Sequence, residues 1–340
     1  MRLALAFVPA LFCVSAHAQT TPPPARLFQA WSSYVAASFN GVIDTEGSSV
    51  QHFWGLAAGS KALGVANTKA ADLCSATGCA GANLCSGVAV LSTGLLDINT
   101  GLYCNSATQT VATWCAGLTS GCTHGGTGRL SALYDQKNPS TAADEFKAAS
   151  YAVAPDFILL GFTGTLAGTQ QPVWGCVSSR STQLVTGTIT AVNAPNSLGM
   201  TYERNANFTT QATAYSDGNG TPWFGGTTTT NTIFAVAQST VTGTAADGSG
   251  TSDFSHPHAV LITQPPVSAG TFYLYIDGGI GGSTAVSYGD TTTTTLAVCS
   301  ESNTGQAAVD AYMTRVWIDN TQVGTTTAEA VTNSATVPFP

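Results

Sequence analysis

The sequence predicts an all-β protein, a sandwich of two antiparallel sheets with little helix. Short runs rich in β-branched and aromatic residues are separated by Gly, Asn, Asp and Pro, a pattern typical of strands joined by tight turns. Helical periodicity is scarce along the chain. The clearest of these runs predict strands at residues 157–160, 233–237, 259–262, 271–276 and 311–318.

Turns and one short helix complete the local pattern. Residues 277–279 (Asp-Gly-Gly) and 217–220 (Asp-Gly-Asn-Gly) have the composition that tight turns favour. Residues 141–150 are the clearest helix candidate, because Ser140 can cap the first turn and Asp144 and Glu145 lie near its positive end. We expect a short helix there, over a sheet edge.

The N-terminus predicts export. Arg2 is followed by an apolar run over residues 3–14, and Ala16-His17-Ala18 is the small-x-small pattern that signal peptidase recognises. The run is shorter than the roughly 20 residues that a transmembrane helix needs, and the bulky Phe12 argues against lipid attachment at Cys13. We expect a signal peptide over 1–18, a mature chain from Gln19 and no transmembrane segment after it.

The cysteines indicate the same compartment. Apart from Cys13 in the expected signal peptide, the chain has eight cysteines, at positions 74, 79, 85, 104, 115, 122, 176 and 299. An even number in an exported chain predicts up to four disulfides, and the spacings are wider than the usual zinc pairs. The sequence therefore predicts an extracellular, cell-surface or periplasmic protein with no metal and no cofactor.

Composition narrows the partners. Only 8% of the residues are charged, the net charge is −8, and ten Lys and Arg residues are scattered over 340 positions. A nucleic-acid-binding surface needs a basic stripe, so nucleic acid is excluded as a partner. A glycan or another cell-surface molecule remains, and so does self-association.

Domain organisation follows from these segments. After the signal peptide, residues 19–27 form a Pro-rich leader, and 28–320 form one domain whose first part, to about 136, is rich in cysteine. Residues 321–340 form a polar tail with few apolar residues, for which we expect disorder or a role in attachment.

A family resemblance rests on motifs in order along the chain. They are Phe-Trp-Gly-Leu at 53–56, Thr-Trp-Cys-Ala-Gly at 113–117, Leu-Tyr-Asp-Gln at 133–136, Pro155, and the run 272–278. Their order resembles the catalytic domain of arabinofuranosidase B over roughly 28–320. The resemblance implies a concanavalin A-like two-sheet jelly roll with a Cys-rich N-terminal extension packed on it.

The same resemblance implies a disulfide. The family's cysteine pair before the Tyr-Asp-Gln strand corresponds to Cys115 and Cys122. If the six clustered cysteines pair among themselves, the two isolated ones, Cys176 and Cys299, must pair with each other.

The activity that the resemblance implies is retaining glycoside hydrolysis, which needs two carboxylates about 5 Å apart. The family's nucleophile is a Glu in a mid-domain strand, and the comparable residues 232–239 contain no acid. The family's general acid corresponds only loosely to Glu301. Asp135 is the other weak catalytic candidate, although an Asp at a strand end favours a loop-fixing role. We therefore expect no hydrolysis of arabinofuranosides.

Other acidic and histidine sites favour structural interpretations. Asp247, Ser249 and Asp253 alternate as in a calcium loop but lack the later Glu, so a hairpin loop is favoured. We expect Glu203 in a surface ion pair with its neighbour, residue 204. His256 and His258 are expected in a solvated loop.

Three functions remain open. The first is a non-catalytic carbohydrate-binding or adhesive protein using exposed aromatic rings at Trp54, Trp174 or Trp223. The second is a diverged glycoside hydrolase using Glu301 with another acid. The third is a structural surface protein that assembles with itself.

Overall fold

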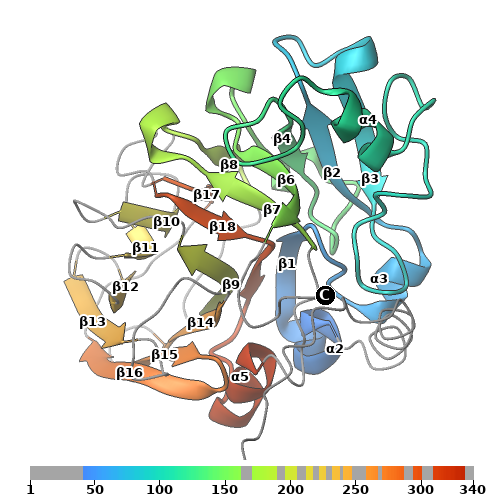
Figure 1. Ribbon diagram of the computed structural model, residues 1–340. Helices are drawn as coiled ribbons and strands as arrows, with labels where there is room; N and C mark the ends of the chain where they lie inside the picture. Colours follow the sequence, from blue (N-terminus) through green and yellow to red (C-terminus); the bar gives the residue numbers. More distant parts are fainter. Residues whose placement is uncertain are drawn as a thin grey trace, which may run out of the picture.

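Figure 1 shows the computed structural model of the chain. It describes residues 41–161, 171–189, 196–204, 212–216, 222–226, 232–237, 240–246, 258–266, 270–286, 294–300 and 309–333. The expected signal peptide, leader and 217–220 turn lie outside the described residues. No helix in the described ranges is long and apolar enough to cross a membrane.

The first of the two antiparallel sheets brings the two ends of the described chain together. Its strands follow one another in the order β1 (Val50–Gly55), β19 (Arg315–Asp319), β9 (Asn196–Arg204), β14 (His258–Gln264), β15 (Gly270–Ile276) and β16 (Gly279–Val286). The first strand thus pairs with the last, which closes the domain.

The second sheet divides into two arms at β4 (Arg129–Leu133), whose ends pair with different strands. One arm is β3 (Leu84–Ala89), β2 (Lys69–Cys74), β4, β6 (Asp156–Gly161), β7 (Gln171–Cys176) and β18 (Ala311–Met313). The other runs from β4 through β5 (Phe146–Lys147), β8 (Leu184–Thr186), β17 (Ala297–Val298), β10 (Ala212–Ser216), β11 (Pro222–Gly226), β12 (Thr232–Ala237) and β13 (Thr240–Ala246).

The Cys-rich part is therefore not an extension packed on the sandwich. Its strands β2, β3 and β4 belong to the second sheet, and β1 belongs to the first. Backbone pairing with the later strands places this part within the domain, a long-range arrangement that local composition does not reveal.

Helical segments are short. Among the described residues the α-helices are α2 (Val42–Glu46), α3 (Lys61–Val65), α4 (Val111–Gly117) and α5 (Thr325–Thr332), and the 3₁₀ turns are η1 (Gly47–Ser49), η2 (Gly81–Asn83), η3 (Ala142–Asp144), η4 (Tyr151–Val153) and η5 (Ser178–Arg180). The structure is thus mostly β, as expected.

The first sheet is covered on both faces, and its side chains alternate between two clusters. Val316 and Ile318 enter the main core between the sheets, whereas Trp317 between them packs on the other face. The ring of Trp317 lies over Gly199, where an added Cβ would lie 2.0 Å from Cζ2. Continuous burial along these strands reflects the covering of both faces.

Helix α5 provides part of the second cover and corrects the expectation for the tail. Its residues Ala328 and Val331 are fully buried with Leu261 and Trp317, and the helix contacts α2, as Figure 1 shows below the first sheet. Residues 325–332 are thus an integral helix. A few apolar residues on one face of the helix are enough to hold it in place, because the first sheet supplies the apolar surface on which they pack.

The expected strand over 311–318 is two strands. Thr314 separates β18 from β19, at the point where the chain passes from the second sheet to the first. The hydroxyl of Thr201 on β9 accepts the backbone N–H groups of Thr314 (2.9 Å) and Arg315 (3.2 Å). A side chain thus replaces ladder hydrogen bonds at the crossing.

The expected helix over 141–150 is wrong. The segment forms η3, then strand β5, whose Phe146 is buried in the main core. Because β5 pairs with both β4 and β8, tertiary pairing overrides the local helix signals.

Four disulfides connect the eight cysteines of the described chain: Cys74–Cys79, Cys85–Cys104, Cys115–Cys122 and Cys176–Cys299. Both expected pairs are present. The last one joins the end of β7 to the residue after β17, and so ties together the two arms of the second sheet.

Candidate functional site

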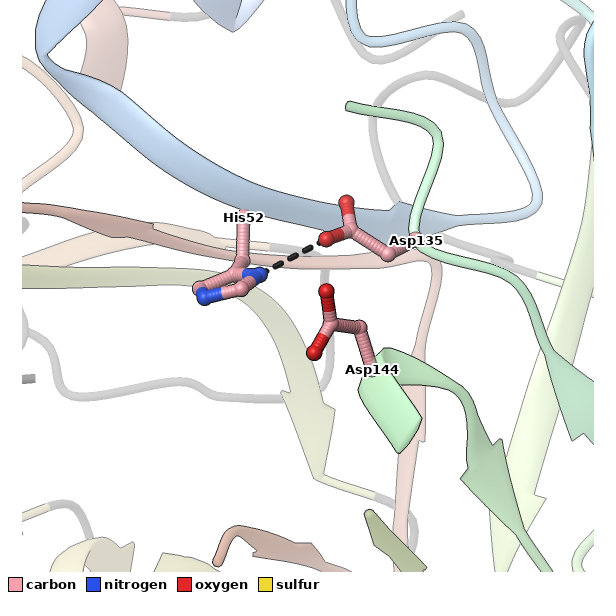
Figure 2. A group of neighbouring side chains, drawn as sticks. All are labelled: His52, Asp135 and Asp144. Atoms are coloured by element: carbon pink, nitrogen blue, oxygen red, sulfur yellow. Dashed lines mark hydrogen bonds and ion pairs between the residues drawn. The ribbon is translucent and has the colours of Figure 1, made fainter. Parts of the chain in front are cut away.

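The side chain of Asp135 is occupied by hydrogen bonds. Its Oδ1 accepts the backbone N–H groups of Phe53 (3.0 Å) and Lys137 (2.9 Å), and its Oδ2 accepts Nδ2 of Asn138 (2.8 Å). Oδ2 also lies 2.7 Å from Nδ1 of His52, as Figure 2 shows. Both Asp135 and His52 are 1% exposed. These contacts support the loop-fixing interpretation of Asp135.

The next residue of the motif, Gln136, has the same kind of role. Its Nε2 donates to the carbonyls of Gly55 (3.0 Å) and Ala57 (2.8 Å), and its Oε1 accepts the N–H of Gly59 (3.0 Å). The Tyr-Asp-Gln motif therefore holds β1 and the loop that follows it.

Two of the three tryptophans expected to bind glycan are in the core. Trp54 and Trp174 are 0% exposed. Trp54 stacks on His52 with ring centroids 5.2 Å apart, meets Phe146 edge-on, and donates Nε1 to the carbonyl of Asp144 at 2.5 Å. The expectation for Trp54 and Trp174 is wrong, because a buried ring offers no face to a ligand.

The remaining expected site residues lie outside what the structure describes. Trp223 belongs to β11, but its side chain is not among those described. Glu301 and the calcium-loop candidates Asp247, Ser249 and Asp253 are outside the described residues.

His258 and Glu203 differ from expectation. His258 is buried at the start of β14, with Nδ1 2.5 Å from Oδ2 of Asp277. Glu203 is 3% exposed, so it is not at the surface. Both lie on strands whose surroundings are set by distant segments.

A row of residues crosses the second sheet on the face opposite the main core and continues onto β9, which pairs with β18 as well as with the first sheet. Paired positions connect Arg129 on β4 to Asp156 on β6, Asp156 to Gly175 on β7, Gly175 to Tyr312 on β18, and Tyr312 to Glu203 on β9. Directly opposed residues share a face, so these five form one line, here called the cross-strand row. At about 4.8 Å per strand, Asp156 and Glu203 are about 14 Å apart along the sheet.

Asp156 is the second member of the cross-strand row, next to Arg129 at one end. It is fully buried and forms ion pairs with Arg129 and with Arg180, whose Nη2 lies 2.5 Å from Oδ1. Its Oδ2 accepts the N–H of Gly125 at 2.7 Å and lies 3.4 Å from Nδ1 of His124. One carboxylate thus positions two guanidinium groups and the 124–125 loop.

Aromatic rings lie beside these charges. The ring of His124, whose side chain is 41% exposed, meets the partly exposed ring of Tyr312 edge-on at 5.8 Å. Tyr312 packs on Ile158 and Val173, and an added Cβ at Gly175 would lie 3.4 Å from its Cε1. The ring therefore lies beside a position without a side chain on this sheet face.

Two carboxylates act on the Tyr312 phenol. Burial, then Glu203 and Asp310, raise the pKa of Tyr312. Asp310 accepts the N–H (2.8 Å) and the hydroxyl (2.5 Å) of Ser178. Burial lowers the pKa of His124, although Asp310 opposes this shift. The site thus combines neutral aromatic groups with paired charges.

Sequence reasoning missed this site because its members are far apart in the chain. Residues 129, 156, 175, 203 and 312 become neighbours only through strand register. The one local signal was that an acid, Asp310, lies two positions before an aromatic residue, Tyr312.

Comparison with known proteins supports the fold. No protein-family model and no curated protein matches the sequence. An arabinofuranosidase crystallised with arabinofuranosyl-α-1,2-xylobiose superposes with a TM-score of 0.53 over 88% of this chain and 65% of that chain, at 11% identity. The chain shares its fold with this arabinofuranosidase.

Other solved structures superpose less well. A GH54 α-L-arabinofuranosidase mutant soaked with 4-nitrophenyl α-L-arabinofuranoside gives a TM-score of 0.48 at 11% identity, over 88% of this chain and 65% of that one. The binding domain of botulinum neurotoxin serotype D/C gives 0.37 at 14% identity, over 61% and 52%. The resemblance to the arabinofuranosidase sandwich expected from the motifs is confirmed at the level of fold.

Proposed function

We propose that the protein is an exported β-sandwich that binds carbohydrate over the cross-strand row without hydrolysing it. The observation that carries this proposal is the partly exposed ring of Tyr312, which lies next to Gly175 and close to charged groups. A sugar offers C–H groups to an aromatic face and hydroxyls to polar side chains. Tyr312 and His124 supply rings, and Arg180 and Asp310 supply donors and acceptors.

The charges favour a neutral glycan over a polyanion. Arg129 and Arg180 are both paired with Asp156, and Asp310 and Glu203 add negative charge nearby. Such a surface lacks the excess of cations that phosphate or sulfate chains require. The four disulfides and the expected signal peptide support an oxidising location outside the cytoplasm.

Binding tests this proposal directly. The probe is arabinofuranosyl-α-1,2-xylobiose, the ligand of the arabinofuranosidase structure, titrated by calorimetry. We expect Tyr312→Ala to bind at least about tenfold more weakly than wild type, because ring stacking contributes about 1 kcal/mol or more. Tyr273→Ala, at a partly exposed tyrosine on the first sheet, is the control. Equal affinity in the Tyr312 variant would reject the site, and so would no binding of this probe or of a panel of neutral glycans by wild type.

A second candidate is a diverged glycoside hydrolase. The observation favouring it is that Glu203 is paired with Tyr312 across β9 and β18, and a second acid, Asp310, lies two positions before Tyr312 in the chain. Retaining hydrolysis uses such a pair. Against it, Asp310 is engaged by Ser178, and residues 232–239, where the family's nucleophile is expected, contain no acid.

Measurement of the hydrolysis rate distinguishes the carbohydrate-binding function from the glycoside-hydrolase function. We expect purified mature protein not to hydrolyse 4-nitrophenyl α-L-arabinofuranoside at an enzyme-like rate. Should it do so, loss of activity in Glu203→Gln with retention in Glu301→Gln would assign the nucleophile to β9. The reverse result would restore Glu301 as the catalytic candidate.

A further inference from the structure

Away from the cross-strand row, a third side chain joins the His52–Asp135 pair. Asp144 is 4% exposed, and Figure 2 shows its carboxylate pointing toward the hydrogen bond between the other two residues. One ligand atom from each of the three lies within 4.8 Å of the others. The three come from β1, from the segment after β4 and from η3.

The backbone of Asp144 is firmly placed. Its N–H donates to the carbonyl of Thr141 at 3.0 Å, and its own carbonyl accepts Nε1 of the buried Trp54 at 2.5 Å. Because η3 is fixed at both of these points, the carboxylate is directed at the pair by the fold.

The charges of this group are not balanced by the part of the chain that the structure describes. Two carboxylates and one imidazole are buried together, and no described residue donates a hydrogen bond to the Asp144 carboxylate. Nε2 of His52 is likewise buried without a hydrogen-bond partner there. Buried charges in proteins are paired or coordinate metals.

We propose that His52, Asp135 and Asp144 form a binding site for one divalent transition-metal ion, of the Zn²⁺ or Mn²⁺ class. An imidazole nitrogen with two carboxylate oxygens favours such ions over Ca²⁺ and Mg²⁺, which prefer all-oxygen sites. Nδ1 of His52 faces both carboxylates, so ion binding replaces its proton, which leaves for solvent or moves to the free Nε2. Water completes the coordination.

The ion has a structural role in this proposal. It connects β1 with the 135–144 segment, next to Trp54 and Phe146 in the main core. The alternative occupant of the same position is a proton shared between Asp144 and Asp135, which would leave the group without affinity for metal.

Metal titration decides between the two occupants. The full chain, stripped with a chelator and dialysed, is titrated with Zn²⁺, Mn²⁺ and Ca²⁺ by calorimetry, and its melting temperature is recorded with each ion. We expect one Zn²⁺ or Mn²⁺ bound per chain, a higher melting temperature with that ion, and little effect of Ca²⁺.

Two variants at neighbouring acids, one in the proposed site and one outside it, test which residues bind the ion. Asp144→Asn should weaken binding by at least about 100-fold, more than the loss of an outer-shell partner. Glu145→Gln, at the adjacent acid that pairs with Lys147, should bind like wild type. No saturable binding of Zn²⁺ or Mn²⁺ by wild type at up to millimolar ion overturns the proposal. Equal affinity in a folded Asp144→Asn protein does the same, and the wild-type titration stands by itself if that variant does not fold.

Discussion

At the scale of single residues, carboxylates in this protein mostly hold backbone. Asp135 accepts two backbone N–H groups, Asp97 accepts those of Thr100 and Gly101, and Asp72 accepts that of Gly87. In a chain with only 8% charged residues, acids at loop ends satisfy donors that strands leave unpaired. The motif at 133–136 indicated this role for Asp135, but not its partners, because His52 and Phe53 are more than 80 positions away.

Replacing Asp135 should therefore affect stability. Asp135→Asn keeps the shape of the side chain, but it weakens the hydrogen bonds from the backbone N–H groups of Phe53 and Lys137 and removes the negative charge beside His52. We expect the free energy of unfolding to fall by about 2–4 kcal/mol, as for other buried charged hydrogen-bond partners. Urea denaturation measures this, with Glu145→Gln, at a partly buried acid paired with Lys147, as the control. Unchanged stability would contradict the loop-fixing role.

At the scale of elements, two acids join α2 to β19. Glu46 at the end of α2 interacts with Asp319 at the end of β19, and its Oε1 accepts Nε1 of Trp317 at 3.2 Å. Burial, then the contact with Asp319, raises the pKa of Glu46 well above its usual value. We expect the two acids to share a proton that holds the helix against the sheet, in a contact between segments at opposite ends of the described chain.

This contact predicts a pH dependence of stability. Since the pKa of Glu46 is higher in the folded than in the unfolded protein, the folded state holds more protons between the two values. The stabilisation is fully present below the pKa that Glu46 has in the unfolded protein, about 4.3. It is lost as the pH rises through the higher pKa that Glu46 has in the folded protein. Glu46→Gln keeps a donor and does not ionise, so its stability relative to wild type should increase with pH.

Urea denaturation at pH 5 and pH 8 measures this difference. Glu329→Gln on α5 should parallel wild type. A Glu46→Gln protein whose stability follows the wild-type curve at both pH values would show that the shared proton is absent.

At the scale of the whole molecule, the Cys176–Cys299 disulfide connects the two arms of the second sheet, which none of the other three disulfides in the described residues does. Its sequence separation is 123, against 7 for Cys115–Cys122. In the chain-entropy model, loops of these lengths contribute about 5 and about 2 kcal/mol to stability. We expect the double serine variant of the long bridge to lose clearly more stability than that of the short one, measured by denaturation without reductant. An equal or smaller loss would mean that the arms of the second sheet hold together without it.

The β class and the even set of disulfide-forming cysteines could be predicted from the sequence alone, which also favoured a loop-fixing role for Asp135. These follow from local composition, turn residues and spacing, which a chain carries at short range. The strands expected at 157–160, 259–262 and 271–276 lie within β6, β14 and β15 for the same reason.

Other features depend on how distant segments pack together. The tertiary structure placed Trp54 and Trp174 in the core, turned 141–150 into a strand between two turns, and made a helix of the polar tail at 325–332. It also aligned Arg129, Asp156, Gly175, Tyr312 and Glu203 across neighbouring strands. The physical reason is that burial and strand register depend on which distant segments pair, and that pairing is set by the packing of the whole core.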